Sequence, residues 1–148
     1  MPKVKVLKII TVLTVLVIWG HSLMPGDTSS SESGFIMSIL LPIWNGIGLG
    51  RIISLSDHIV RKVFGHFAEY TLLGMELKGL TPFIIKPFVT GWMVAFIDES
   101  IQLISADRGP AIADVWLDMA GVATGMIVVK LCQMIISYFK DKKRAGVH

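Results

Sequence analysis

The sequence predicts an all-α integral membrane bundle of about four transmembrane helices, together with one interfacial or re-entrant segment. Of its 148 residues, 53% are hydrophobic and 17% are charged, whereas soluble proteins average about 25% charged residues. The mean hydropathy is +0.67. Because this composition leaves too few polar side chains to cover a water-exposed surface, we expect lipid to surround the bundle. The length suits a single domain over residues 1–148.

Charge and cysteine content exclude several classes of function. The net charge of +3 is small, and the placement of the basic residues follows membrane topology, so we expect no nucleic-acid partner. The one cysteine, Cys132, lies in an apolar run. It cannot form a disulfide within the chain and does not indicate a cysteine-based metal site. We therefore expect Cys132 to be a buried, small apolar side chain.

The first predicted span covers about residues 6–24 and follows Lys3, Lys5 and Lys8. A cleaved signal peptide has the same basic start and apolar core. The apolar run continues past Trp19, however, and no A-x-A-like cleavage site follows it. We therefore expect an uncleaved transmembrane helix, with Trp19 near a membrane interface.

The stretch after this span changes from polar to apolar. Residues 25–34, PGDTSSSESG, are predicted to form a polar loop. Residues from about 35 to 50 are apolar, but they include Pro42 and several glycines, so they are too short and too interrupted for a full span. We predict that they form an interfacial or re-entrant segment that lies on the bundle as a lid or collar, with Trp44 at headgroup level.

Three further spans are predicted over about residues 64–80, 83–104 and 113–139. Four spans place both termini on one side of the membrane, and the excess of Lys and Arg assigns that side to the cytoplasm. Only four of the 14 basic residues then lie outside, namely Arg51, Arg61, Lys62 and Arg108. We therefore expect a multi-pass plasma-membrane protein with both termini in the cytoplasm.

This topology brings the polar residues of three spans to one depth near the outer face. Successive spans run in opposite directions, so the start of the second, the end of the third and the start of the fourth lie together. The residues concerned are His66 and Glu69, then Asp98, Glu99 and Gln102, then Asp114 and Asp118. Residues three or four positions apart share a helical face, which also groups Lys62 and Tyr70 with His66.

The fourth span combines acidic and small residues on one face. Asp114 and Asp118 are followed by Gly121 and Gly125 at the same spacing. A small-xxx-small pattern lets a neighbouring helix approach closely. The acidic stripe of this span is therefore expected to face protein rather than lipid.

Carboxylates at this depth need compensation, because an ionised carboxylate at the centre of a membrane helix costs roughly 2.5–3.5 kcal/mol on insertion scales. Basic partners such as Arg108 and Lys62, protonation, or a bound cation could supply it. One candidate cofactor is a divalent cation held by Glu69, Asp98 and Asp114, since oxygen ligands suit Mg²⁺ or Ca²⁺. Ionisable residues within a membrane indicate a functional site by default.

Three blocks of the sequence together resemble the VanZ-like membrane proteins, which are linked to low-level teicoplanin resistance. The blocks are RKVFGHFAEYTLLG at 61–74, DESIQLISADRG at 98–109 and ADVWLDMAGVATG at 113–125. The resemblance implies a cell-envelope location and a role in glycopeptide tolerance, but no defined reaction. Many members carry Asn where this chain has Asp118, so this chain presents one more negative charge at that position.

Two functions of different classes are compatible with these residues. The first is an enzyme that acts at the outer leaflet on a lipid-linked or cell-wall substrate and uses carboxylates as general acid and base. Asp98 and Glu99 point to different sides of their helix, so Asp98 with Asp114 is the expected pair. The catalytic candidates are Asp98, Glu99, Gln102, Arg108 and Asp114, and the substrate-binding candidates are Lys62, His66, Glu69, Tyr70 and Asp118.

The second function is a non-catalytic membrane module that binds a glycopeptide, a cell-wall precursor or a partner protein. A polar outer pocket under an apolar collar would serve this function equally well. A transporter or ion-pathway fragment is a third interpretation, but the polar residues do not reach the inner half of the predicted bundle, so a through path is unsupported.

Overall fold

The computed structural model describes residues 2–48, 56–105 and 111–145, and these residues form helices and their connections. The helices are α1 (Pro2–Leu23), α2 (Gly26–Gly46), α3 (Asp57–Val60), the π-helix η2 (Arg61–Phe67), α4 (Ala68–Leu80), α5 (Ile85–Gln102) and α6 (Ile112–Ala145). α3, η2 and α4 follow one another without a break. The predicted all-α fold is confirmed.

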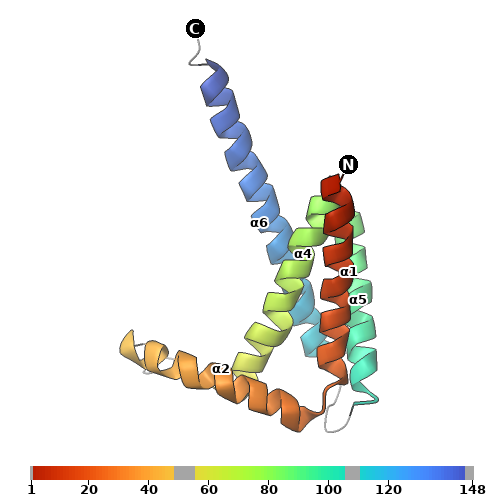
Figure 1. Cartoon of the computed structure of the whole chain (residues 1–148), viewed down its shortest axis with the longest axis vertical. Helices are drawn as coiled ribbons and strands as arrows, with labels where there is room; N and C mark the ends of the chain where they lie inside the picture. The colour runs from red at the N-terminus through yellow and green to blue at the C-terminus, as the bar shows by residue number, and fades with distance from the viewer. Residues whose placement is uncertain (1, 49–55, 106–110, 146–148) are drawn as a thin grey trace.

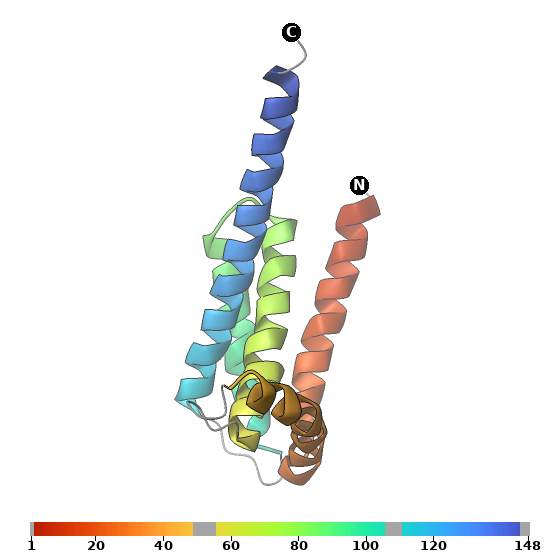
Figure 2. The same cartoon turned by 90° about the vertical axis from the view of Figure 1, so that its left-hand side faces the viewer.

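Four helices, α1, α4, α5 and α6, lie side by side and alternate in direction along the chain (Figure 1). Both termini therefore lie at one end of the bundle, and α2 crosses the other end (Figures 1 and 2). α4 and α6 run in the same direction and form the most extensive helix pair. The alternation agrees with the predicted order of the spans and positions the starts of η2 and α6 beside the ends of α1 and α5.

Glycines allow α4 and α6 to pack backbone against backbone. A Cβ added to Gly125 would lie 2.1 Å from the carbonyl oxygen of Thr71, and one added to Gly74 would lie 2.3 Å from that of Val122. Gly121 packs in the same way against Phe67. The predicted small-xxx-small contact of the fourth span is thus present, and its partner is α4.

Two helical stretches of the described chain, Lys3–Leu23 and Ile112–Arg144, are long and apolar enough to cross a membrane. The predicted spans at 64–80 and 83–104 are helical over most of their length, in η2, α4 and α5, but they are not among these two stretches. α5 has three charged side chains, Lys86, Asp98 and Glu99, within its 18 residues. Large apolar side chains such as Leu13, Phe96 and Ile135 are exposed on the outside of the bundle. This surface is what a lipid environment requires.

The predicted polar loop over residues 25–34 is wrong, because α2 begins at Gly26. Pro25 has an extended backbone with φ −56° and ψ 152° and stands just before the helix. A serine-rich, acidic composition suits the first turns of a helix, where backbone N–H groups lack partners. Pro42 lies inside α2 without ending it, and the helix continues to Gly46.

Two smaller predictions also need correction. Cys132 is exposed on α6 rather than buried, because the second half of this helix extends beyond the neighbouring helices (Figure 1). α6 also continues to Ala145, past the predicted end at 139. With 34 residues it is about 50 Å long, which exceeds the roughly 30 Å hydrocarbon core of a membrane.

Candidate functional site

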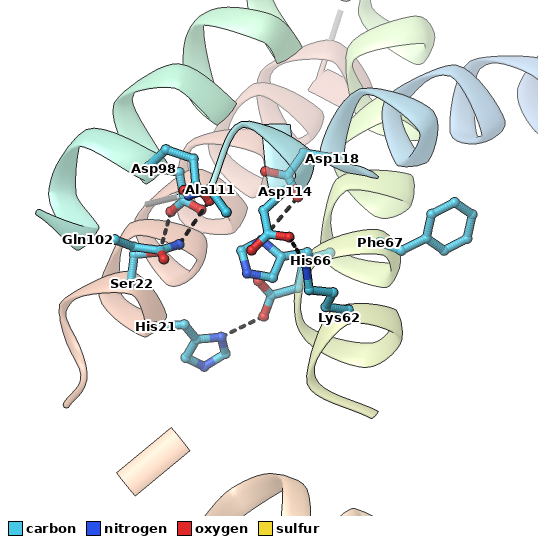
Figure 3. A network of polar contacts seen from close by, with 12 residues as sticks. His21, Ser22, Lys62, His66, Phe67, Asp98, Gln102, Ala111, Asp114 and Asp118 are labelled. Atoms are coloured by element: carbon cyan, nitrogen blue, oxygen red, sulfur yellow. Dashed lines mark hydrogen bonds and ion pairs between the residues drawn. The ribbon is translucent and has the colours of Figure 1, made fainter. Parts of the chain in front are cut away.

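The polar residues predicted on three separate spans meet at the end of the bundle that α2 crosses (Figure 3). At this end, η2 and α6 begin while α1 and α5 finish. His66 comes from η2, Asp98 and Glu99 from the last turns of α5, and Asp118 from the second turn of α6. One ligand atom from each of these four side chains lies within 4.8 Å of the other three. We call these four residues the inner cluster.

The inner cluster is nearly sealed from solvent. Asp118 is 0% exposed, Asp98 is 1% and Glu99 is 6%. The side chain of His66 is the most accessible member, at 19%. Any molecule that reaches the cluster would therefore meet His66 first.

Hydrogen bonds orient each carboxylate of the inner cluster (Figure 3). Ser22 at the end of α1 donates to Asp98 Oδ1 at 2.6 Å. The Glu99 carboxylate accepts bonds from Gln102 Nε2 at 3.1 Å and from the backbone N–H of Ala111 at 2.8 Å. His66 Nδ1 lies 3.1 Å from Asp118 Oδ1. The four side chains are thus fixed by groups from four helices.

Two buried polar atoms at this site have no hydrogen-bond partner among the described residues. They are Asp118 Oδ2 and the hydroxyl of Tyr70, and both residues are 0% exposed. Tyr70 packs against Gly121, which lies one turn after Asp118 on α6. Burying a polar group without a partner costs about 1–3 kcal/mol in proteins. The fold therefore retains two unsatisfied groups at the place where its acidic residues converge.

Two further polar pairs lie beside the inner cluster. Lys62 pairs with Asp114, and His21 Nδ1 lies 2.5 Å from Glu69 Oε1. The side chains of Lys62 and His21 are 28% and 45% exposed. These pairs form a more accessible rim above the buried cluster.

The histidine and the lysine of the site both lie on the π-helix η2. Lys62 and His66 are four residues apart, as are Asp114 and Asp118 on α6, and the two pairs face each other across the parallel helices. π-helical turns are rare and often occur at functional sites. The π-helix therefore carries two of the residues that make polar contacts at the site, Lys62 and His66.

The structure groups the predicted site residues differently from the expected pairs. Glu99 reaches the same cluster as Asp98, although the two are adjacent on α5. Asp114 pairs with Lys62 rather than with Asp98, and Glu69 pairs with His21. The predicted cation ligands Glu69, Asp98 and Asp114 therefore do not converge, whereas the inner cluster does. Arg108, a predicted catalytic residue, lies outside the described residues.

Two site residues, His21 and Ser22, were missed by the sequence predictions. Both stand at the end of the first apolar span. Their position along the chain could have identified them, because the alternating topology brings the end of the first span to the same depth as the acidic residues. Gln102 and Tyr70, which were predicted, do lie at the site.

In chemical terms, the site combines an imidazole, three carboxylates and a phenol in a water-poor environment. Such a set can transfer protons between closely spaced groups or hold a cation through nitrogen and oxygen ligands. Comparison with protein families finds a match between residues 7–133 and the family model described as VanZ/LLP1. Comparison with curated proteins and with solved structures finds no match.

Proposed function

The chain belongs to the VanZ/LLP1 family, and from this premise we propose that it is a membrane-embedded enzyme acting on the headgroup of a lipid-linked or cell-wall substrate. Family membership and two long apolar helices indicate a membrane protein. The observation that carries the enzymatic proposal is the inner cluster, with its buried and unpaired Asp118 Oδ2. Membrane proteins rarely retain ionisable groups of this kind without a function.

His66 is the proposed general base or acid of this enzyme. It is the most accessible member of the inner cluster, and its imidazole interacts with Asp118, which can orient it. Asp98 and Glu99 supply a second proton-transfer site on the opposite side of the cluster. Lys62 and His21 lie at the rim, where they would meet a negatively charged headgroup.

The position of α2 supports a site at headgroup level. Phe35, Ile39, Ile43 and Ile47 are all exposed and follow one another at intervals of four residues, so they share one face. Such a stripe on a helix that lies across the bundle suits burial at the boundary between headgroups and acyl chains. α2 also contacts η2, which carries His66 and Lys62.

In this proposal α1, η2–α4, α5 and α6 all cross the plasma membrane, both termini are cytoplasmic and the site faces the outer leaflet. The test is labelling of single-cysteine variants in intact cells, on a Cys132→Ser background. An impermeant reagent should label cysteines at Ser30 and Gly109 but not at Gly79 or Ala145. The reverse pattern would place the site at the cytoplasmic face and overturn the outer-leaflet assignment.

Substitution of the inner cluster tests the activity. His66→Gln and Asp98→Asn should lower teicoplanin tolerance and the turnover of lipid-linked cell-wall precursors in membranes. Loss of a general acid or base typically reduces rates by about 10²–10⁴-fold. Glu76→Gln is the matched control. Glu76 is a buried carboxylate like Asp98, but it lies on α4 away from the inner cluster and accepts a hydrogen bond from Thr14.

Unchanged tolerance and turnover in Asp98→Asn, with normal accumulation of the protein, would refute the enzymatic proposal. A non-catalytic binding module would give a different result. The wild type would show no turnover, and each substitution would weaken the binding of a glycopeptide or precursor in proportion to the contacts it removes.

A further inference from the structure

We propose that the inner cluster binds one divalent transition-metal cation of the Mn²⁺, Fe²⁺ and Zn²⁺ class. The ligands are His66, Asp98, Glu99 and Asp118. This inference deepens the proposed function, on whose choice of site it rests. In the metal-bound protein, His66, Asp98 and Glu99 would be ligands rather than direct proton-transfer groups, because a lone pair that binds a cation cannot also accept a proton. The inference concerns binding and can be measured without a known reaction.

The four ligand atoms lie close enough together to share one cation. Atoms that coordinate one metal at about 2.1 Å lie at most about 4.2 Å apart. The four ligand atoms of the inner cluster lie within 4.8 Å of one another. A contraction of a few tenths of an ångström toward a common centre would therefore complete the site, which side-chain rotation can supply.

The inner cluster carries more carboxylates than basic partners. Asp98, Glu99 and Asp118 are buried together, and within the described ranges no lysine or arginine forms an ion pair with any of them. Lys62, the cation on the adjacent turn of η2, is paired with Asp114. A divalent cation would supply the missing positive charge at the point where the carboxylates converge.

Two buried polar atoms at the inner cluster lack a partner that a bound cation would provide. Asp118 has one oxygen against His66 and a second, Oδ2, with no partner among the described residues, and the residue is 0% exposed. A bound metal ion would be the partner that this oxygen lacks. The equally buried Tyr70 hydroxyl also needs an acceptor or donor, which a water on the metal would provide.

The ligands are already oriented by surrounding groups, as metal sites require. Ser22 holds Asp98, while Gln102 and the Ala111 N–H hold Glu99. Imidazole favours Zn²⁺ and Fe²⁺, and carboxylates favour Mn²⁺, whereas Mg²⁺ and Ca²⁺ prefer oxygen ligands alone. The mixed donor set therefore points to a transition metal.

The test uses the full-length protein purified in detergent. Its metal content is measured by mass spectrometry, and Mn²⁺ and Zn²⁺ are titrated into chelator-treated protein by calorimetry. We expect about one cation per chain in the wild type. Asp98→Asn and Asp118→Asn should each raise the Kd by at least about 100-fold, and Ser22→Ala, which removes an orienting bond, by about 10-fold.

Two matched controls separate the cluster from other carboxylates. Glu69→Gln removes a nearby acidic group that pairs with His21, and Glu76→Gln removes one at the far end of α4. Both should leave the Kd within about twofold of the wild-type value. If every variant elutes from size-exclusion chromatography at the same volume as the wild type, then loss of the cation does not result from unfolding.

The inference is overturned if the wild type binds neither Mn²⁺ nor Zn²⁺ and carries no iron, or if the cation persists in the Asp98→Asn/Asp118→Asn double variant. Selective binding of Mg²⁺ or Ca²⁺ would also overturn it. These outcomes are distinct from failure of the proposed function: bound metal without any effect of His66→Gln on turnover would refute the enzyme alone.

Discussion

The contact between α4 and α6 predicts a strong effect of Gly125→Ala. The added methyl carbon would lie 2.1 Å from the carbonyl oxygen of Thr71 and 2.7 Å from the backbone nitrogen of Met75, whereas ordinary contact begins near 3.4 Å. The two helices would have to separate locally by about 1.3 Å. Both obstructing atoms belong to the backbone, so no side-chain rotation can relieve the clash.

Overpacking of a core costs typically about 1–3 kcal/mol, and the rigid neighbours place this substitution at the upper end of that range. A loss of about 3 kcal/mol reduces the ratio of folded to unfolded protein by about a hundredfold. Separation of the helices should also lengthen the 3.1 Å contact between His66 and Asp118 beyond hydrogen-bonding distance. Gly125→Ala should therefore lose site function as well as stability.

The free energy of unfolding can be measured by titrating dodecyl sulfate into the protein in mild detergent and following tryptophan fluorescence. Gly20→Ala is the control, because a Cβ at Gly20 in α1 meets nothing within 4 Å, so its stability should be unchanged or slightly higher. If Gly125→Ala proves as stable as Gly20→Ala, the close α4–α6 contact described above is incorrect.

Three further results are expected. Thr14→Val removes the 2.9 Å bond to Oε1 of the buried Glu76, whose other oxygen has no partner among the described residues, so unfolding in the same titration should become easier by about 1–3 kcal/mol. An unchanged midpoint would contradict this. Lys62→Met removes the partner of the mostly buried Asp114 and should cost about 1–2 kcal/mol, between the values for surface and buried ion pairs; a double variant with Asp114→Asn should recover part of the loss. Cys132 is exposed on α6, a helix proposed to cross the membrane, so N-ethylmaleimide, which enters detergent micelles, should label the folded protein to the same end point as the denatured protein. Incomplete labelling of the folded protein at that end point would restore the original expectation of burial.

The helical face of α6 was predictable because periodicity is a local property of the chain. Asp114, Asp118, Gly121 and Gly125 recur at intervals that put them on one side of any α-helix. Small residues on that side indicated close packing, and the structure confirms it. The depth of the acidic residues followed in the same way from the order and direction of the apolar runs.

The partners of these residues were not predictable by the same reasoning. Periodicity says which face of a helix is polar, but not which neighbour it meets or at what rotation. Asp114 and Asp118 lie on the same face, yet one pairs with Lys62 and the other joins the inner cluster. Glu99 was assigned to a different side from Asp98, although its longer side chain reaches the Ala111 N–H at the start of α6.

α2 shows where local signals misled. The serine-rich residues 26–34 were expected to form a loop and Pro42 to interrupt the apolar segment, yet one helix runs from Gly26 to Gly46. Weak intrinsic propensity is overridden when a helix gains contacts, and α2 packs against α3 and η2 across the end of the bundle.

The sequence by itself determined the all-α class, the long apolar helices, the shared depth of the acidic residues and the glycine face of α6, since each depends on composition or on spacing along one helix. Tertiary structure alone decided which side chains converge. The π-helical turn of η2, the approach of α1 with His21 and Ser22, and the close α4–α6 contact set the rotations of four helices about their axes. Those rotations, which no single segment encodes, place His66, Asp98, Glu99 and Asp118 at one point.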